Sequence, residues 1–212
     1  MIINDRDKQI IAEVSRWQGM LGRHVRLLCG FTNIHTSDRR LKKLIDGGYL
    51  MRKRYIYGVA GILSITPKAQ RDFDIYLPIG EQRLDQIEHD IAVVDTVIYM
   101  IHKYKIPPEL ILSEKQLRHE HGFAKRKHMP DFTFTRKEKT YCVEVELSMK
   151  AKDRLQKIIK DNYLAYDYQR WVVPQSKIII RRVLETNSKA YTNIGVIDME
   201  VVNEYIQGEL SK

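Results

Sequence analysis

The sequence has few cysteines and no long hydrophobic segment, and these absences narrow the classes of protein to which it can belong. Cys29 and Cys142 are the two cysteines among 212 residues, and they lie far apart between apolar neighbours. Neither a disulfide framework nor a cysteine-based zinc site is indicated by such a pair. No segment approaches the roughly 20 apolar residues that span a bilayer, and the N-terminus has no apolar run after its charged residues. We therefore expect a soluble, cytoplasmic protein without a membrane partner.

The positive charge is concentrated near the N-terminus. The chain carries a formal net charge of +9. Residues 1–76 hold 14 Lys and Arg against 7 Asp and Glu, whereas residues 77–212 hold 22 against 20. A localised surplus of this kind suits a polyanion such as DNA. The same boundary separates the two domains that the hydrophobic pattern predicts.

Hydrophobic periodicity in residues 1–76 predicts three helices and a two-stranded hairpin. Apolar residues recur at helical spacing over 5–17, 21–31 and 36–46, and Asp5 or Asp7 can cap the first helix. Residues 49–66 alternate around a glycine-containing turn, as a hairpin does, before a further short helix opens. This order is that of a winged helix-turn-helix domain.

Basic residues follow the two elements that such a domain presents to DNA. Its third helix would enter the major groove, where Arg can pair with guanine, and cations of the wing would hold phosphates. The residues expected to bind DNA are Thr36, Ser37, Arg39, Arg40, Lys42, Lys43, Arg52, Lys53 and Arg54. The alternative interpretation of the charge run is a solvated helix face.

Residues 77–212 predict a second domain of mixed helices and strands. Its expected elements are a helix over 81–104, a short strand and a charged turn over 109–120, a hairpin of 131–135 with 140–147, a helix over 149–169, a strand over 176–184, a short helix near 186–193, a strand over 193–199 and a C-terminal helix. This order indicates an α/β sandwich on a mixed sheet. The chain as a whole is therefore expected to belong to the α+β or α/β class.

Three acidic residues are expected to meet at one edge of this sheet. Alternate residues of a strand share a face, so Glu144 and Glu146 point the same way, and Asp131 lies on the neighbouring antiparallel strand. Converging carboxylates suit Mg²⁺ or Mn²⁺, which could activate water and neutralise charge at a scissile phosphate. Glu114 could be a further ligand, or it could be a solvated residue of a turn.

This acidic pattern resembles the PD-(D/E)XK nuclease superfamily, whose first two acidic positions match Asp131, after a proline, and Glu144. The resemblance implies a restriction-endonuclease-like αβββαβ fold. The superfamily has a lysine two residues after its second acid, where this chain has Glu146. Either Lys150 or Lys152 of the next helix has taken over that role, or the site does not cut.

The order of short motifs along residues 5 to 185 resembles the replication-relaxation family of plasmids and integrative elements. These motifs are RRLKKLIDGGYL, HDIAVVD, LSEKQLR, PDFTF and VEVELSMK. The resemblance implies a DNA-binding protein of a mobile genetic element, linked to plasmid replication and conjugal mobilisation. The partners expected are double-stranded DNA, a second copy of the chain in a homodimer, and relaxosome or replication proteins.

Three functional hypotheses follow. The first is a DNA-binding protein whose second domain serves assembly and needs no cofactor. The second is a DNA endonuclease dependent on Mg or Mn and targeted by the winged helix, and the third is a transcriptional repressor of the element's own genes.

Two further groups of residues could contact nucleic acid. A histidine-rich basic segment, 118–130, holds His119, His121 and His128 around Lys125, Arg126 and Lys127, with spacing that favours a phosphate-contacting loop over a zinc site. The aromatic residues Tyr163, Tyr166, Tyr168 and Trp171 could stack on bases. Helical spacing favours packing against the sheet for the first two.

Overall fold

The chain folds into two compact units. The structure, a computed structural model, describes residues 2–122 and 128–211. The N-terminal unit is Met1–Ile98 and the C-terminal unit is Tyr99–Lys212. This division lies later than the boundary at residue 76 that the sequence predicts, because the first turns of the helix beginning at Ile87 pack with Leu21 and Ile62. Within the described residues, no helix has both the length and the apolar composition that crossing a bilayer requires.

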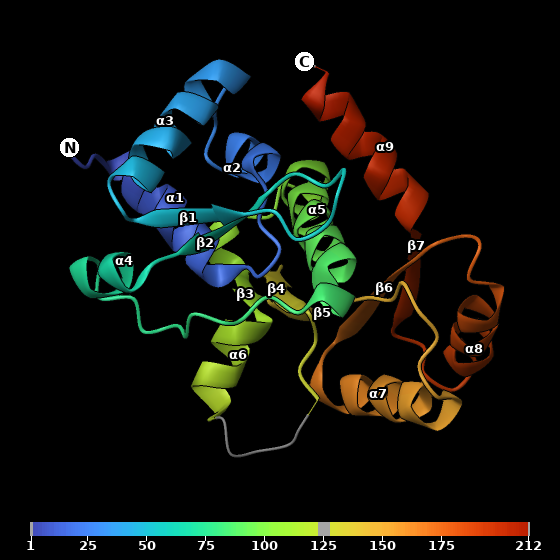
Figure 1. Ribbon diagram of the computed structural model, residues 1–212. Coiled ribbons are helices and arrows are strands. Elements are labelled where there is room, and N and C mark those ends of the chain that lie inside the picture. The colour runs from blue at the N-terminus through green and yellow to red at the C-terminus, as the bar shows by residue number, and fades with distance from the viewer. Residues whose placement is uncertain (1, 123–127, 212) are drawn as a thin grey trace. The chain divides into compact units, whose positions relative to one another are not determined.

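The N-terminal unit consists of short helices and a two-stranded sheet (Figure 1). Its elements are α1 (Asp5–Arg16), α2 (Gly22–Leu28), α3 (Ile34–Asp46), β1 (Leu50–Lys53), β2 (Ile62–Ile65), α4 (Pro67–Asp72), η1 (Leu84–Gln86) and the first part of α5 (Ile87–Tyr104). The three helices and the hairpin expected from the sequence are all present.

Helix α1 begins at a capping box formed by Asn4 and Asp7. Asp7 N donates to Asn4 Oδ1 at 3.0 Å, and Asn4 N donates to Asp7 Oδ2 at 2.8 Å. Two backbone N–H groups that the helix leaves without partners are thereby satisfied. The cap is Asn4, so the expectation of Asp5 or Asp7 in that position was wrong. Ile10 and Val14 are buried, as their spacing predicts.

The hairpin is tied to the helices by the backbone and by a threonine cap. β1 and β2 pair antiparallel, with Leu50 opposite Ile65. Leu63 N donates to Met20 O at 2.8 Å, which adds the segment between α1 and α2 to the edge of β2. The Thr66 side chain caps α4 by accepting from Ala69 N, and α4 then starts at a proline.

A buried network joins α2 to α5. Leu21 N donates to His24 Nδ1 at 3.1 Å, so His24 Nε2 carries the proton and donates to Asp95 Oδ1 at 3.0 Å. Arg23 Nη2 donates to Asp95 Oδ2 at 2.6 Å. Burial lowers the pKa of His24 by more than Asp95 raises it. Burial raises the pKa of Asp95, but hydrogen bonds and charge from His24 and Arg23 outweigh it, so this pKa is lowered.

The C-terminal unit is built on one mixed sheet. Its elements after α5 are η2 (Pro108–Leu110), β3 (Ile111–Ser113), α6 (Glu114–His121), β4 (Phe132–Arg136), β5 (Lys139–Val145), α7 (Lys152–Ala165), β6 (Tyr168–Val173), α8 (Ile178–Ser188), β7 (Ile194–Asp198) and α9 (Met199–Leu210). The strand order is β3-β4-β5-β6-β7. β3, β4 and β5 are antiparallel, and β5, β6 and β7 are parallel. The chain is thus of mixed α and β composition with a five-stranded mixed sheet, as the sequence predicts.

Two elements differ from the sequence-based expectation. The run 176–184 was expected to be a strand, but α8 occupies it and buries Ile180, Val183 and Leu184 at helical spacing. The strand that the sequence did not predict is β6. It begins within the last residues of the helix expected over 149–169 and continues to Val173. The misleading signal was a run of three isoleucines, because β-branched residues favour strands and tertiary packing can override this preference.

A second correction concerns residues 114–121, which were expected to form a charged turn and instead form α6. Ser113 and Gln116 make a capping box, with Ser113 N donating to Gln116 Oε1 at 3.0 Å and Gln116 N donating to Ser113 Oγ at 3.4 Å. This combination of a hydroxyl and a glutamine three residues later is a helix-start signal. The apolar residue inside the helix, Leu117, is buried.

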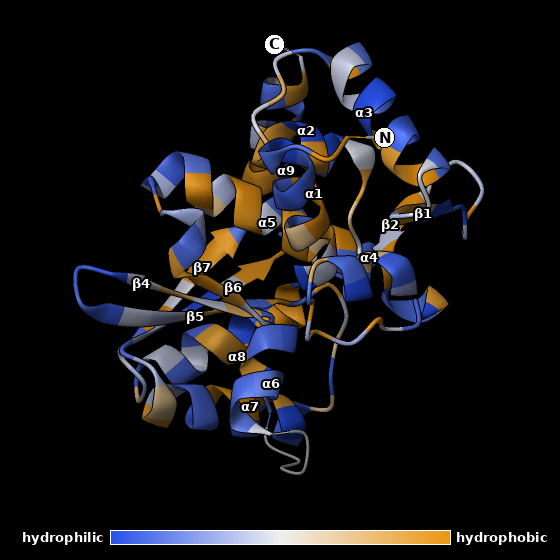
Figure 2. Ribbon diagram, turned by 90° about the vertical axis from the view of Figure 1, so that its left-hand side faces the viewer, coloured by the Kyte–Doolittle hydropathy of each residue, from blue (hydrophilic) through white to orange (hydrophobic). Residues whose placement is uncertain are grey.

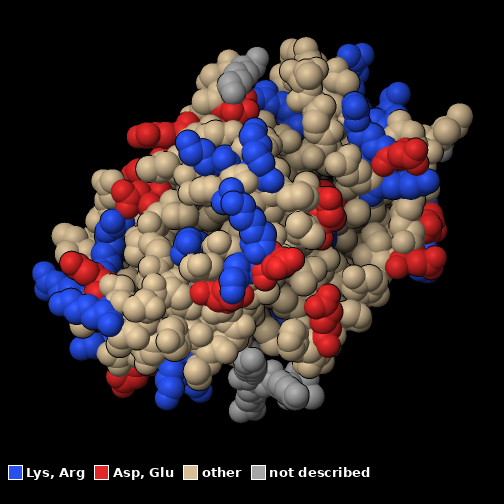
Figure 3. Space-filling view, turned by 180° about the vertical axis from the view of Figure 1, so that it is seen from behind, with Lys and Arg blue, Asp and Glu red and all other residues tan. Residues whose placement is uncertain are grey.

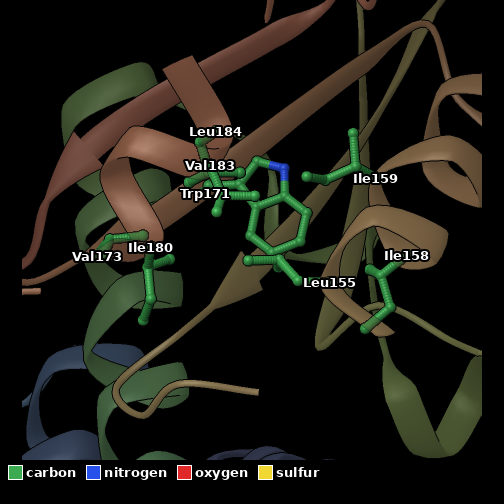
Figure 4. Packing of buried hydrophobic residues seen from close by; sticks show 8 residues of the cluster. All are labelled: Leu155, Ile158, Ile159, Trp171, Val173, Ile180, Val183 and Leu184. Carbon is green, nitrogen blue, oxygen red and sulfur yellow. The ribbon is translucent and has the colours of Figure 1, made fainter. Parts of the chain in front are cut away.

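Trp171 is the centre of the hydrophobic core of the C-terminal unit. Figure 4 shows its ring between side chains of α7 and α8, which cover one face of the sheet. Its indole N–H donates to Gln169 Oε1 at 3.1 Å, so burying it leaves no polar atom without a partner. β7 and the C-terminal end of β6, where Val172 and Val173 lie, are hydrophobic (Figure 2). A role for Trp171 in stacking on bases, which the sequence left open, is inconsistent with its complete burial.

Candidate nucleic-acid interface and acidic cluster

Helix α3 carries a buried face and a basic face. Asn33 caps it by accepting from His35 N at 2.8 Å. Leu41 and Leu44 are completely buried on the inner side, which fixes which side chains can point outward. Arg39, Lys42 and Lys43 are exposed with Thr36, as expected for a helix that meets a ligand with its cations.

Two residues of α3 that were expected to bind DNA, Ser37 and Arg40, point toward the rest of the N-terminal unit instead. The guanidinium of Arg40 pairs with the fully buried carboxylate of Asp7 through two hydrogen bonds. Burial raises the pKa of Asp7, but the hydrogen bond and charge from Arg40 outweigh burial and hold that pKa below its usual range. Ser37 is buried, and its hydroxyl has no hydrogen-bond partner among the described residues. Arg40 therefore fixes α3 against α1, and Ser37 faces the core.

A basic pocket opens beside α3 and involves a residue that the sequence did not single out. The pocket has a volume of about 340 Å³ and is lined by Asn4, Arg6, Phe31, Thr36, Arg39, Arg40 and Lys43. The guanidinium of Arg6 lies over the Phe31 ring, 4.9 Å from its centroid. Four cationic side chains around one hollow attract anions. No sequence pattern indicates Arg6, because its place beside α3 depends on how α1 packs.

The exposed side of the hairpin holds a second group of cations. Arg52, Lys53 and Arg54 are all exposed on β1 and the residue after it. A Cβ at Gly61 would approach Arg52 Cγ to 2.7 Å, so glycine leaves room for the aliphatic part of that arginine. In the loop between the strands, Tyr57 is 98% exposed.

Charge of both signs covers the molecule away from these elements. Figure 3 shows Lys and Arg interspersed with Asp and Glu over the face that is drawn. The net charge of +9 is therefore not by itself an argument for a binding face. The argument depends on which cations are exposed on α3 and β1.

Two of the acidic residues that the strand pattern singled out are buried in the C-terminal unit. Glu144 and Glu146 are each 2% exposed. Glu144 Oε1 accepts from Asn162 Nδ2 of α7 at 2.8 Å and lies 2.6 Å from His128 Nε2. Asp131 Oδ2 accepts from Val145 N at 2.7 Å, which joins β5 to the residue before β4.

Positive groups neutralise both glutamates. Lys150 forms an ion pair with Glu146. Burial lowers the pKa of His128, but the hydrogen bond and charge of Glu144 outweigh burial and raise it above the usual value. Burial also raises the pKa of Glu144, which His128 and Asn162 offset only in part. The His128 ring and the Glu144 carboxyl therefore titrate as an interacting pair.

The carboxylates are not arranged to hold a metal ion. Among the described residues, no group of three or more His, Cys, Asp or Glu has that arrangement. Glu114 lies at the start of α6, where its backbone N donates to Asp131 O at 3.0 Å, and its carboxylate accepts from Arg118 Nε at 2.9 Å. Lys152 is exposed at the first turn of α7. The residues present fit an internally neutralised cluster better than they fit Mg²⁺ or Mn²⁺.

Comparison with known proteins identifies no relative. No family model, no curated protein and no solved structure matches this chain. The function therefore has to be argued from the two sites themselves.

Sequence reasoning found most members of the cluster and missed one. Asn162 was not predicted, because a buried asparagine on a helix gives no pattern that distinguishes it from a solvated one. His128 was noted as part of a basic loop, and it is the histidine of that loop that reaches Glu144. Lys125, Arg126 and Lys127 of the same loop lie outside the described residues.

Proposed function

We propose that the N-terminal unit binds duplex DNA as a winged helix-turn-helix domain and that the C-terminal unit is a nuclease-like domain that does not cut. The observation that carries the proposal is the set of exposed cations on α3 and on the hairpin. The exposed cations of α3 are Arg39, Lys42 and Lys43. Those of the hairpin are Arg52, Lys53 and Arg54. Helices that read DNA lie in the major groove, and wing cations hold its backbone.

The pairing of Arg40 with Asp7 supports this assignment. A recognition helix has to keep one orientation relative to the rest of its domain, because a bidentate contact to a base depends on the angle of the helix. The ion pair with a fully buried carboxylate holds α3 to α1 in such an orientation. Arg40 then acts as a positioning residue, and Arg39 is the residue of α3 best suited to reading a base.

The basic pocket beside α3 suits a backbone phosphate. Arg6 comes from α1 and Lys43 from α3, so an anion between them would contact two helices. Contacts to phosphate fix the register of a protein on DNA without reading its sequence. The pocket therefore complements the base contacts proposed for Arg39.

The proposal that the C-terminal unit does not cut rests on its ion pairs. Lys150 neutralises Glu146, and His128 lies on Glu144, so both buried carboxylates are engaged. A role in the replication or mobilisation of a mobile element, as a dimer with replication or relaxosome proteins, rests on the motif resemblance alone.

The test compares two variants that lose the same charge. Arg39→Gln with Lys42→Gln alters the proposed interface, whereas Lys157→Gln with Lys160→Gln alters exposed lysines of α7. Duplex binding is measured by fluorescence anisotropy over a series of salt concentrations. We expect the α3 variant to bind at least about tenfold more weakly, since a bidentate base contact is worth about 1–3 kcal/mol, and the α7 variant to bind like the wild type. Equal affinities and equal salt dependence for both variants would refute the proposal.

One alternative is a DNA endonuclease dependent on Mg²⁺ or Mn²⁺, and the observation that favours it is the contact of Asp131 with the backbone N of Val145, between the buried Glu144 and Glu146. The assay incubates the full chain with supercoiled DNA and either ion, with Glu144→Gln as the control. Cleavage by the wild type that the variant lacks would establish this alternative. Intact DNA in both reactions is the result we expect.

A further inference from the structure

A pocket in the C-terminal unit combines an aromatic floor with two arginines. Its volume is about 180 Å³, and it is lined by the last turns of α5 and by residues of β4, β5, β6 and β7. Tyr104, Phe134 and Tyr141 supply the aromatic lining, and Arg136 and Arg170 supply the charge. Tyr141 and Glu144 are three positions apart in β5, and side chains of a strand alternate between its two faces. The pocket therefore lies on the face of the sheet opposite to Glu144.

The aromatic residues form a row across three strands. Phe134 lies opposite Tyr141 in the β4–β5 register, and Tyr141 lies opposite Tyr168 in the β5–β6 register. The rings of Phe134 and Tyr141 stack with centroids 4.6 Å apart, and those of Tyr141 and Tyr168 stack at 4.8 Å. The row is therefore held in place before any ligand arrives.

A glycine on the next strand leaves room for the guanidinium of Arg170. Gly195 lies opposite Arg170 in the β6–β7 register, and a Cβ there would approach Arg170 Nη1 to 2.7 Å. The guanidinium lies 5.4 Å from the Tyr141 ring centroid and 5.3 Å from that of Tyr168. Its Nη1 also donates to Gln169 O at 3.0 Å.

Both arginines keep their charge available to a ligand. Within residues 2–122 and 128–211, neither Arg136 nor Arg170 forms an ion pair with a carboxylate. Arg136 is exposed at the turn end of β4, 6.0 Å from the centroid of the Tyr104 ring, and Arg170 is half-buried. Two guanidinium groups beside an aromatic floor match a ligand that has a flat ring and an anionic group.

We propose that this pocket binds a nucleotide of an unpaired nucleic-acid strand, with the base on the aromatic floor and a phosphate at Arg136. The size of the pocket limits what can enter. A cavity of about 150 Å³ holds a single benzene ring, whereas pockets for larger ligands have about 300–1,000 Å³. The base therefore enters, and the sugar and phosphate stay at the mouth, where Arg136 is exposed. A base within a duplex is covered on both faces by stacking and cannot enter.

The ligand chemistry follows from general preferences of single-strand sites. Such sites combine cations along the backbone with aromatic side chains that accept any base. Arg adds a planar cation that can itself lie against a base. The site is separate from α3, so it would give the protein a second nucleic-acid contact with a different preference.

The experiment measures binding of a short fluorescent single-stranded oligonucleotide to the full chain. All variants carry Arg39→Gln and Lys42→Gln, so that the proposed duplex site does not contribute. In this background, Arg136→Gln removes the cation at the mouth and Gly195→Ala displaces the guanidinium of Arg170. Arg182→Gln is the matched control, because Arg182 is exposed on α8 and loses the same charge. A second ligand is an abasic oligonucleotide with the same number of phosphates.

We expect Arg136→Gln and Gly195→Ala to raise the Kd by about tenfold or more, with the control within about twofold of the background, given the strength of base stacking on aromatic residues. The abasic strand should bind about tenfold more weakly than the strand with bases. If Arg136→Gln binds like Arg182→Gln, or if the abasic strand binds as tightly as the strand with bases, the inference is overturned. Should Gly195→Ala fail to fold, Arg136→Gln still decides, since it changes an exposed side chain. The duplex proposal is tested with a different ligand, duplex DNA, and with different variants, those of Arg39 and Lys42, so the two proposals can fail independently.

Discussion

Replacing Lys150 with methionine should destabilise the C-terminal unit. We expect a larger effect than from replacing His128 or Asn162, which contact the carboxylate of Glu144. The variant keeps the length of the side chain and removes its charge. Glu146 then remains 2% exposed, with no other partner for its Oε2 among the described residues. A buried carboxylate without a counter-charge is costly, and removing one partner of a buried ion pair destabilises a protein by about 3–5 kcal/mol.

The lower end of this range is expected because Lys150 itself is not fully enclosed. Its side chain is 25% exposed, against 3% for Glu146, so water can reach the site from the lysine side. We therefore expect a loss of about 3 kcal/mol in the free energy of unfolding at neutral pH. The double variant Lys150→Met with Glu146→Leu should recover most of it, because well-packed apolar residues often replace a buried ion pair without loss.

The assay is urea unfolding followed by tryptophan fluorescence in a Trp17→Phe background. Trp17 belongs to the N-terminal unit and Trp171 to the core of the C-terminal unit, so the remaining signal reports on the unit that contains the ion pair. A loss below about 1 kcal/mol for Lys150→Met, or no recovery in the double variant, would refute the view that this ion pair neutralises the cluster.

Four further predictions concern pH and packing. A histidine whose pKa is lowered on folding binds protons less readily than in the unfolded chain, so the N-terminal unit should lose stability as pH falls below about 6.5, and His24→Gln should reduce this loss. The pKa of His128 is raised in the folded protein, so its protonated ring stabilises the C-terminal unit fully below about pH 6.5. This stabilisation should disappear as the pH rises through the pKa that His128 has in the folded protein, and urea midpoints at several pH values would measure the loss. Gly19→Ala would bring a Cβ to 2.5 Å from the backbone carbon of Asp90, and a calorimetric scan should show a loss of about 1–3 kcal/mol. Leu155→Ala in the Trp171 core should cost about 2–5 kcal/mol by the same urea assay.

The local pattern of the sequence predicted most elements. The structure buries both Glu144 and Glu146 and puts Asp131 in contact with the backbone of Val145 between them, whereas a common site formed by the three carboxylates stays a prediction. The isoleucine-rich run of α8 misled, since a run of three β-branched residues is compatible with either a buried strand or a helix until its neighbours are known.

Long-range pairings could not be predicted from spacing. Arg40 resembles its basic neighbours in the sequence, and only the fold reveals that it contacts Asp7, 33 residues earlier. The engagement of Glu144 by Asn162 depends in the same way on how α7 packs against the sheet. Periodicity assigns residues to faces, whereas the partners on those faces depend on packing between distant segments.

The hydrogen bond from Val145 N to Asp131 Oδ2 has a consequence for the order of folding. It closes the open end of the β4–β5 hairpin, whose other end is a two-residue turn at Lys137 and Glu138. Contacts within a hairpin need only a short loop to close, and they form within microseconds, whereas parallel pairing of β5 with β6 has to wait for α7. We expect Asp131 to be joined to β5 early, and the hydrogen bond from Asn162 to Glu144 to form only when α7 docks.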